Sequence, residues 1–395
     1  MLYEIKDKAH ELSDEITGWR HYFHKHPELS YHETETAAKI ASLLKGMGYT
    51  DVKLGCSKGN ICVVANLNAE RESGKCIALR ADIDALGVQE KRDVPYKSEN
   101  DGAMHACGHD AHISMLLGAA KILKELEPKL RGRVRLIFQH AEETGAGARD
   151  LVDEGVLEGV DVIYGQHIWS PVPSGSMTYC LGPTMASADK FELDIRGSGG
   201  HGSMPHLSID PVIAACSVIS AWQTIISREV DPLESAVISV GAIKSGSVFN
   251  AIPDSATVIG TTRTFSQEIR ENLASRMKEL AEAVCSGFRC KAEFIYHYML
   301  PPTVNDPEFT RFAASVAKEI MGDEKVFETK PTMGAEDFSF YLQERPGAFM
   351  FLGTGNPEKD MVYPQHHPKY CVDDDVLALG TAVTAAIAWA YLNGK

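Results

Sequence analysis

Nine consecutive residues, Met104 to His112, contain three histidines, one cysteine and one aspartate. Cys107 and His109 stand two positions apart with Gly108 between them, so in an extended stretch both side chains leave the backbone on the same side. Thiolate and imidazole are the usual protein ligands of zinc and the neighbouring first-row metals. The segment therefore predicts a metal site that holds one ion or bridges two, with further ligands elsewhere in the chain.

Other ligand-type side chains follow apolar runs that read as buried strands. Glu142 and Glu143 come after the run 133–138, His167 closes the run 160–166, and His366 lies in a proline-flanked loop. The carboxyl ends of parallel strands meet at one edge of a sheet, where open α/β folds bind ligands. Adjacent glutamates point apart, so one can bind metal while the other faces a reacting water. Each residue alone has an ordinary structural explanation, but together they favour one site.

Four nearby residues have open roles. Asp82, at the end of the run 76–81, is either a turn residue or the acceptor that fixes the imidazole of a metal ligand. Asp110 fits the N-cap of the helix that follows it. His105 and His112 fit better as neighbours of ligands than as ligands.

Apolar periodicity predicts how these residues are positioned. Helices are expected over 5–23, ended by Pro27, over 33–46, from 110 onward and over 146–158, and strands over 61–67, 76–81, 134–138 and 160–164. Strands that alternate with helices indicate an α/β fold with a mostly parallel sheet.

The order of elements changes after Pro183. From Lys190 the pattern reads strand, glycine-rich loop, helix, strand, strand, helix and strand, which is the βαββαβ order of a ferredoxin-like α+β domain. Pro301-Pro302 closes it, and helix and strand signals then resume. We therefore predict a discontinuous metal-binding domain of residues 1–185 and 300–395, with a second domain of residues 186–299 inserted into it.

The composition limits which classes of binding partner and which cellular compartment we expect. The 395 residues carry a formal net charge of −15, which disfavours nucleic acid and anionic membranes as partners. Nine cysteines without regular spacing do not suggest a disulfide framework, and neither a signal peptide nor a membrane-length apolar run is evident. We expect a cytoplasmic protein.

Five strings, RADIDAL, MHACGHDAH, AEETGAGARDLV, GSGGHGSMPH and HHPKYCVDDD, resemble the M20 metallopeptidase family, and specifically its amidohydrolase branch. That branch includes aminoacylase-like, hippurate and auxin-conjugate hydrolases. The resemblance covers nearly the whole chain in the right order. It implies a two-metal catalytic domain interrupted by a lid domain through which subunits form a homodimer or a higher homo-oligomer.

The resemblance also assigns roles. It makes five residues the ligands of two divalent ions (Zn, Mn, Co or Ni), and makes Glu142 the base that takes a proton from water. The five are Cys107, His109, Glu143, His167 and His366. Many M20 peptidases carry an HxD motif whose histidine binds metal, whereas this chain has Arg80-Ala81-Asp82. The amidohydrolase branch is expected to compensate with Cys107 and His109, which favours it over the dipeptidase and carboxypeptidase branches.

Three residues of the second domain resemble functional lid residues. His201 matches a lid histidine thought to reach the partner subunit's site, where an imidazole can stabilise a developing oxyanion. Asn250 and Arg263 resemble residues that hold substrate, and the guanidinium of Arg263 can clasp a carboxylate, although a surface salt bridge explains it as well. Glu336 and Asp337 lie in a further motif of the family, without an assignable role.

The leading hypothesis is a binuclear metal-dependent amidohydrolase that cleaves an N-acyl-amino acid to a carboxylic acid and a free amino acid. Alternatives are a metal-dependent dipeptidase or carboxypeptidase, an enzyme that uses Cys107 as a nucleophile activated by His105 or His109, and a non-catalytic metal-dependent ligand-binding protein. Loss of activity on chelation would exclude the cysteine nucleophile.

Overall fold

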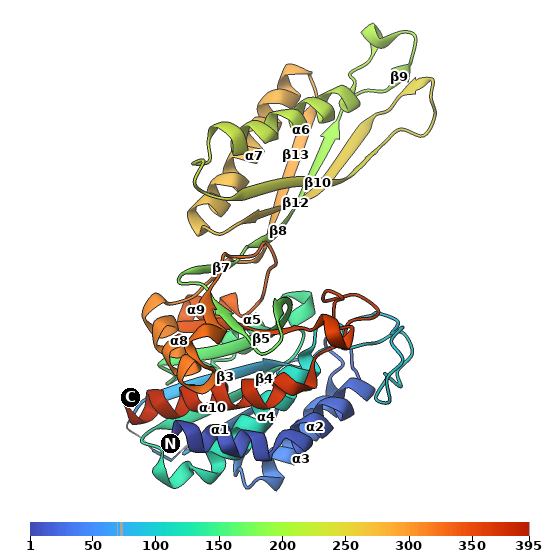
Figure 1. Ribbon diagram of the computed structural model, residues 1–395. Helices are drawn as coiled ribbons and strands as arrows, with labels where there is room; N and C mark the ends of the chain where they lie inside the picture. The colour runs from blue at the N-terminus through green and yellow to red at the C-terminus, as the bar shows by residue number, and fades with distance from the viewer. Residues whose placement is uncertain (69, 72–73, 395) are drawn as a thin grey trace. The chain divides into compact units, whose positions relative to one another are not determined.

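The computed structural model describes residues 1–68, 70–71 and 74–394, which separate into two compact units (Figure 1). Unit 1 comprises residues 1–182, 305–330 and 337–395, and unit 2 comprises residues 183–304 and 331–336. Each unit has its own hydrophobic core. The chain thus leaves unit 1, builds most of unit 2 and returns to unit 1, and the short segment 331–336 again belongs to unit 2.

Unit 1 is built on a sheet that is parallel at its centre. Its described strands are β1 (Asp51–Cys56), β2 (Gly59–Leu67), β3 (Cys76–Asp82), β4 (Arg133–Gln139), β5 (Val162–Pro173), β6 (Met177–Tyr179), β15 (Val326–Glu328) and β16 (Gly347–Gly355). They lie in the order β1-β2-β4-β3-β5-β16-β6-β15, and the central pairs β4-β3, β3-β5 and β5-β16 are parallel. The prediction of an α/β fold with a mostly parallel central sheet is confirmed.

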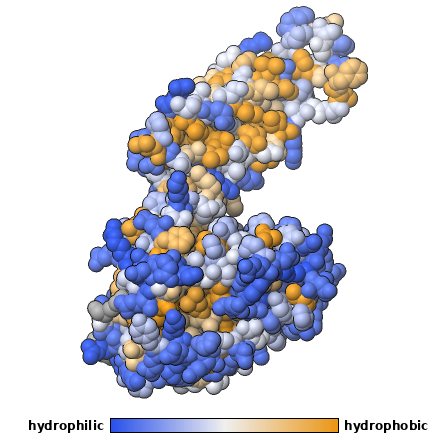
Figure 2. Space-filling view, in the orientation of Figure 1, coloured by the Kyte–Doolittle hydropathy of each residue, from blue (hydrophilic) through white to orange (hydrophobic). Residues whose placement is uncertain are grey.

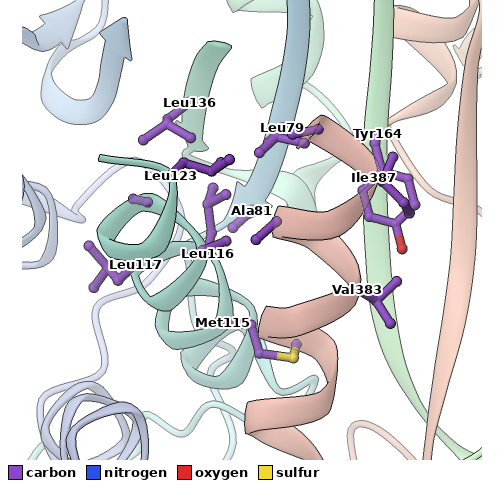
Figure 3. Packing of buried hydrophobic residues seen from close by; sticks show 14 of the residues in the cluster. Leu79, Ala81, Met115, Leu116, Leu117, Leu123, Leu136, Tyr164, Val383 and Ile387 are labelled. Atoms are coloured by element: carbon purple, nitrogen blue, oxygen red, sulfur yellow. The ribbon is translucent and has the colours of Figure 1, made fainter. Parts of the chain in front are cut away.

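Helices complete unit 1 and bury the sheet. They are α1 (Leu2–Glu11), α2 (Ser13–Lys25), α3 (Thr34–Gly46), α4 (His109–Glu125), α5 (Gly147–Asp153), α8 (Pro307–Met321), α9 (Ser339–Glu344) and α10 (Leu377–Asn393). Leu116 and Leu123 of α4 pack with Ile387 of α10 and with Leu79 of β3 in the main core (Figure 3). Among the described residues one helical segment, Asp374–Asn393, is apolar and long enough to cross a membrane, but 72% of its most apolar window is buried, as in a core helix.

Two helix predictions in unit 1 are wrong in detail. The helix expected over 5–23 is interrupted at Leu12, where the Ser13 hydroxyl donates a hydrogen bond to the carbonyl of His10 at 2.5 Å and so competes with helix pairing. Both halves bury the same apolar face, which is why the spacing reads as continuous. The helix expected over 146–158 ends at Asp153, and Gly155 follows at φ +78°, a conformation that ends helices.

Unit 2 has the predicted βαββαβ order. Its described strands β8 (Ala188–Arg196), β10 (Ala236–Ser245), β12 (Ser255–Thr264) and β13 (Lys291–Leu300) form an antiparallel sheet in the order β10-β12-β8-β13. Helices α6 (Pro211–Arg228) and α7 (Gln267–Gly287) pack with it around the buried Trp222 and Phe191. Short strands form two further pairs, β9 (Gly200–His201) with β11 (Ala251–Ile252), and β7 (Pro183–Met185) with β14 (Thr303–Val304).

Candidate metal centre

Side chains from four separate segments of unit 1 meet at the carboxyl edge of its parallel strands. Cys107, His109 and His167 form one group whose ligand atoms all lie within 4.8 Å of one another, and Cys107, Glu143 and His366 form another. The two groups share the sulfur of Cys107. The structure therefore brings together the five side chains that the resemblance assigned as ligands.

Local backbone conformation aims these side chains. Gly108 is the N-cap of α4 at φ +93°, and a Cβ atom there would lie 2.2 Å from Cδ1 of Ile168, so only glycine fits between Cys107 and His109. Beyond β4, Ala141 adopts φ +51° and leads into a short 3-10 helix, Glu142–Thr144, that carries both glutamates. The left-handed conformations at Gly108 and Ala141 thus direct the cysteine, histidine and glutamate side chains toward the site.

The expectation that Asp110 caps α4 is wrong. Asp110 is fully buried, and its Oδ2 accepts hydrogen bonds from Nε of Arg20 and Nδ1 of His24, each at 2.8 Å. These contacts tie the start of α4 to α2. Asp110 is a buried anchor because its charge is paired with a guanidinium that is itself inaccessible.

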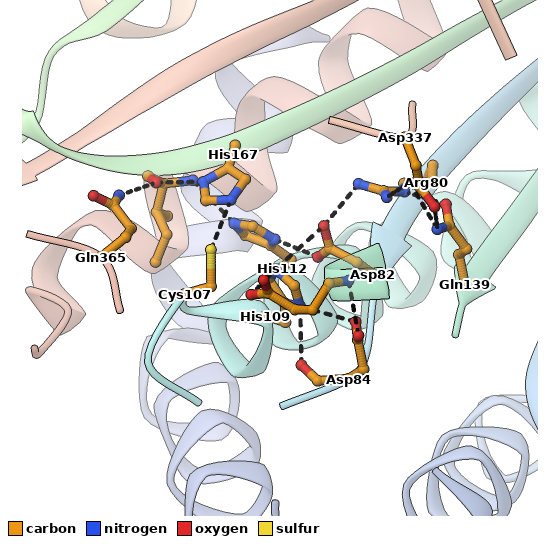
Figure 4. A network of polar contacts seen from close by, with 12 residues as sticks. Arg80, Asp82, Asp84, Cys107, His109, His112, Gln139, His167, Asp337 and Gln365 are labelled. Carbon is orange, nitrogen blue, oxygen red and sulfur yellow. Dashed lines mark hydrogen bonds and ion pairs between the residues drawn. The ribbon is translucent and has the colours of Figure 1, made fainter. Parts of the chain in front are cut away.

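Hydrogen bonds fix which imidazole nitrogen is open to a metal. Nδ1 of His109 lies 2.9 Å from the carbonyl oxygen of Asp84, and Nδ1 of His167 lies 2.5 Å from that of Ile168 (Figure 4). A carbonyl only accepts, so Nδ1 carries a hydrogen, and in the neutral ring Nε2 is the nitrogen that can bind a metal in place of a proton. Nε2 of His109 and Oε1 of Glu143 are buried without a hydrogen-bond partner among the described residues. Buried ligand atoms with no hydrogen-bond partner fit a metal ion, which would supply the missing partner.

The electrostatics of the site also favour a cation. Burial lowers the pKa of His109, but the charge of Asp82 and the contacts with Asp84 outweigh it and raise this pKa to about 10. Burial raises the pKa of Glu143 to about 7, and the charge of Asp84 adds to this while His109 opposes it. Carboxylates crowded at low exposure repel one another, and a bound cation would relieve that repulsion.

Residues beside the candidate ligands hold them in place. Nδ1 of His112 bonds Oδ1 of Asp82 at 2.5 Å, and its Nε2 accepts from the backbone N–H of Ile168 at 2.9 Å. Both ring nitrogens of His112 are thus engaged, while Asp82, His109 and His112 also offer ligand atoms within 4.8 Å of one another. Asp82 therefore orients His112, while Asp84 orients His109 and also accepts from the backbone N–H of Glu143 at 3.0 Å.

Asp84 and Asp337 were not assigned a role from the sequence. Asp84 stands two positions after Asp82 in RADIDAL, the alternation that places both carboxylates on one side of a strand end, and this was the available signal. Oδ1 of Asp337 accepts from Nη2 of Arg80 at 2.9 Å, and its Oδ2 accepts from the backbone N–H of Ala148 at 2.9 Å. Arg80 also forms an ion pair with Asp82 at 2.7 Å, so linked ion pairs hold the end of β3 in place.

His105 and Glu336 differ from these residues. His105 is buried, neither of its ring nitrogens has a hydrogen-bond partner among the described residues, and burial lowers its pKa to about 4. Glu336 is a buried residue of unit 2.

The three candidate lid residues lie in unit 2. His201 of β9 is exposed, and its Nδ1 accepts from the backbone N–H of Ser203 at 3.1 Å, which leaves the hydrogen on Nε2. Asn250 precedes β11, the partner strand of β9. Arg263 lies near the far end of β12 and donates from Nη1 to the carbonyl of Thr262 at 2.9 Å. Eight strand steps from Ser255 to Arg263 correspond to roughly 26 Å, so His201 and Arg263 occupy opposite ends of the unit.

A mixed α/β domain that gathers thiol, imidazole and carboxylate donors at the carboxyl edge of its parallel strands has the construction of a metallohydrolase. Comparison with known proteins agrees. Residues 78–390 match the model of peptidase family M20/M25/M40, and the chain belongs to this family. It is a hydrolase of the M20 group.

Three relatives illustrate the range of this similarity. Thermostable carboxypeptidase 1 of Saccharolobus solfataricus is 40% identical, over 100% of this chain and 99% of its own length. N-acetyl-L-cysteine deacetylase of Bacillus subtilis is 41% identical, over 97% of this chain and 88% of its own. A Bacillus subtilis crystal structure described as a dinuclear metal binding peptidase from the M20 family superposes with a TM-score of 0.85 at 35% identity, covering 98% and 99% of the two chains.

Proposed function

We propose that this protein is a binuclear metal-dependent amidohydrolase that cleaves N-acyl-amino acids to a carboxylic acid and a free amino acid. The observation that carries the proposal is that five ligand-type side chains lie close together. In two of them, His109 and His167, a hydrogen bond from Nδ1 to a backbone carbonyl leaves Nε2 to face the other ligands. The B. subtilis structure described as dinuclear supports two ions. Sulfur and nitrogen donors favour zinc, cobalt or nickel, and the carboxylate also accommodates manganese.

Cys107, His109, Glu143, His167 and His366 would hold the two ions. When bound, such ions polarise the substrate carbonyl and make water acidic enough to attack it near neutral pH. No other part of the chain needs to supply a nucleophile. Cys107 belongs to both groups of ligand atoms, which supports metal binding by its sulfur over nucleophilic attack.

Glu142 is the proposed base. Its side chain is buried beside His109 and Glu143, and the three offer ligand atoms within 4.8 Å of one another. From this position its carboxylate can take a proton from the attacking water and deliver it to the leaving nitrogen, which must be protonated to depart as an amine. One carboxyl group thus serves both halves of the reaction.

Unit 2 is the proposed lid and dimerisation domain. His201 has its Nε2 hydrogen available to stabilise the oxyanion, and Asn250 stands next to it on the paired ribbon. Arg263 would bind the carboxylate of the amino acid. Because Ser255, at the end of β12 that follows the β9–β11 pair, lies roughly 26 Å along the strand from Arg263, His201 and Arg263 cannot both contact one small substrate from the same chain. This supports a homodimer in which His201 serves the partner's site.

Exposed apolar side chains on unit 2 support such self-association. Hydrophobic residues gather on its visible face (Figure 2). The large apolar side chains of unit 2 that are exposed include Leu207, Ile213, Leu233, Ile243 and Phe249. Patches of this kind mark protein interfaces. We also propose a reducing, cytoplasmic location, since none of the nine cysteines, all of them described, is in a disulfide and Cys107 must stay reduced to bind metal.

Carboxypeptidase activity is the second candidate, because a relative with that name matches this chain over its full length. The two activities share their chemistry: a carboxypeptidase also cleaves an amide whose nitrogen belongs to an amino acid with a free carboxylate. Only the acyl side differs. An assay that compares N-acetyl, N-benzoyl and N-indoleacetyl amino acids with dipeptides of the same carboxyl-terminal residue separates them.

Glu142→Gln tests the proposed reaction. The variant should keep the metal content of the native protein and lose about 10²- to 10⁴-fold in kcat on the best N-acyl-amino acid, the usual contribution of a general base. Glu158→Gln, at an exposed position, is the matched control and should retain full activity. Turnover that persists in metal-replete Glu142→Gln, or that survives chelation of the native enzyme, would refute the proposal.

A further inference from the structure

A second cluster of metal-binding side chains lies apart from the candidate catalytic ligands. The sulfurs of Cys56 and Cys62 and a ring nitrogen of His140 all lie within 4.8 Å of one another, and this group includes none of the five catalytic donors. We propose that Cys56, Cys62 and His140 form a separate site for a thiophilic metal ion such as Zn²⁺ or Cu⁺. The proposal concerns binding and is independent of the reaction catalysed.

Sheet geometry brings the three residues together. Strands β1 and β2 form a hairpin in which the register shifts between Leu54 and Cys56, and such a bulge re-aims the side chain that follows it. Strand β2 pairs with β4 so that Val63 lies opposite Phe138. Cys62 is therefore close to the end of β4, and His140 directly follows that end. The three residues thus come from β1, β2 and the end of β4, which are neighbours in the sheet.

His140 is the strongest indication that a ligand belongs there. Its side chain is fully buried, and neither ring nitrogen makes a hydrogen bond with any described residue. Oδ2 of Asp150 lies 3.4 Å from Nε2, at ion-pair distance but without hydrogen-bond geometry. A buried imidazole without such a partner is costly, and a metal ion would satisfy one of its nitrogens. Asp150 is placed to be a fourth ligand or to orient the ring.

The donor chemistry selects the class of ion. Two sulfurs and one imidazole match tetrahedral zinc sites and exclude magnesium or calcium, which prefer oxygen. Cys62 is buried while Cys56 is partly exposed, so an ion can enter past Cys56.

An ion bound at this site would stabilise the segment that connects β4 to the two glutamates of the candidate catalytic centre. His140 is followed by Ala141 and then by the two glutamates, so an ion held by His140 would anchor the start of that segment to the β1–β2 hairpin. The ion would also stabilise the folded state by binding it in preference to the unfolded chain. We expect zinc to raise the Tm of the native protein more than that of a variant without this site.

Cobalt spectroscopy distinguishes this site from the catalytic one. Because Cys107 would also bind Co²⁺ through sulfur, the test begins from the Cys107→Ser variant, in which remaining thiolate-to-cobalt absorption in the near ultraviolet reports on the new site. The band should persist in Cys107→Ser and vanish when Cys56→Ser is added. Adding Cys216→Ser, at an exposed cysteine of unit 2, is the matched control and should leave the band unchanged.

Zinc stoichiometry after gel filtration gives a second readout. Cys56→Ser, and separately Cys62→Ala, should each bind one zinc fewer per chain than the native protein while circular dichroism and catalytic turnover stay close to native. The proposal is overturned if both variants retain the native stoichiometry, if the cobalt band survives Cys56→Ser, or if the fully reduced native protein binds no ion beyond those held by the catalytic ligands.

Discussion

Replacing Asp84 with asparagine tests whether the residues around the metal centre set its affinity. Oδ1 of Asp84 lies 3.2 Å from Nδ1 of His109, and its Oδ2 accepts from the backbone N–H of Glu143 at 3.0 Å. One carboxylate therefore positions two proposed ligands from different segments. Asparagine keeps the size but removes the negative charge, so the shape of the site should survive while these bonds weaken.

The expected magnitude follows from those contacts. Hydrogen bonds to charged groups contribute about 1.5–3 kcal/mol each, and about 1.4 kcal/mol corresponds to a tenfold change in affinity. The carbonyl of Asp84, which is unchanged in the variant, also accepts from Nδ1 of His109 at 2.9 Å. It should preserve the imidazole tautomer and limit the loss. We therefore expect metal affinity to fall about 10- to 100-fold, nearer to the lower value.

Competition with a chromophoric chelator measures this affinity directly. Ser30→Ala is the matched control, because the Ser30 hydroxyl donates to the same carboxylate at 2.7 Å. It should weaken metal binding by less than about threefold, since it leaves the charge and both ligand contacts in place. A folded Asp84→Asn protein that binds metal as tightly as the native protein would refute the idea that Asp84 orients the ligands.

Three further predictions concern Glu33, His201 and Arg263. Burial raises the pKa of Glu33 from 4.5 to about 8, so the stability of the folded protein should fall as pH rises between these values. Glu33→Gln mimics the protonated form. With a chelator present, this variant should have a Tm a few degrees above that of the native protein at pH 9 and nearly the same Tm at pH 5. His201→Ala should reduce kcat about 10²- to 10³-fold, and mixing it with Glu142→Gln should restore activity if His201 acts on the partner's site; no recovery after subunit exchange would contradict this. Arg263→Lys should raise KM about tenfold for N-acyl-amino acids but not for their carboxamides, and an equal effect on both would exclude a carboxylate clamp.

Much of the fold could be predicted from apolar periodicity, because buried strands and amphipathic helices leave clear patterns. The failures have local physical causes. At the break at Leu12 the Ser13 hydroxyl bonds the carbonyl of His10, a contact that leaves the apolar spacing of α1 and α2 unchanged. The end of α5 depends on the conformation of Gly155 rather than on any change in hydrophobicity.

Some residues of the candidate site could likewise be predicted from the sequence, and others could not. Ligand-type residues such as Cys107 and His109 are visible in sequence because their chemistry is unusual at that density. The roles of Asp84 and Asp110 were not predictable, because a carboxylate that orients an imidazole and one that caps a helix look identical until their partners are known. Arg20 and His24, the partners of Asp110, are about ninety positions away in the chain.

Anomalous diffraction from crystals grown with Mn²⁺ tests the central claim most directly. The account predicts two peaks per chain, both enclosed by Cys107, His109, Glu143, His167 and His366, with Nε2 of the two inner histidines directed at metal. A fully folded protein that shows no peak among these side chains at saturating Mn²⁺, Zn²⁺ or Co²⁺ would contradict it.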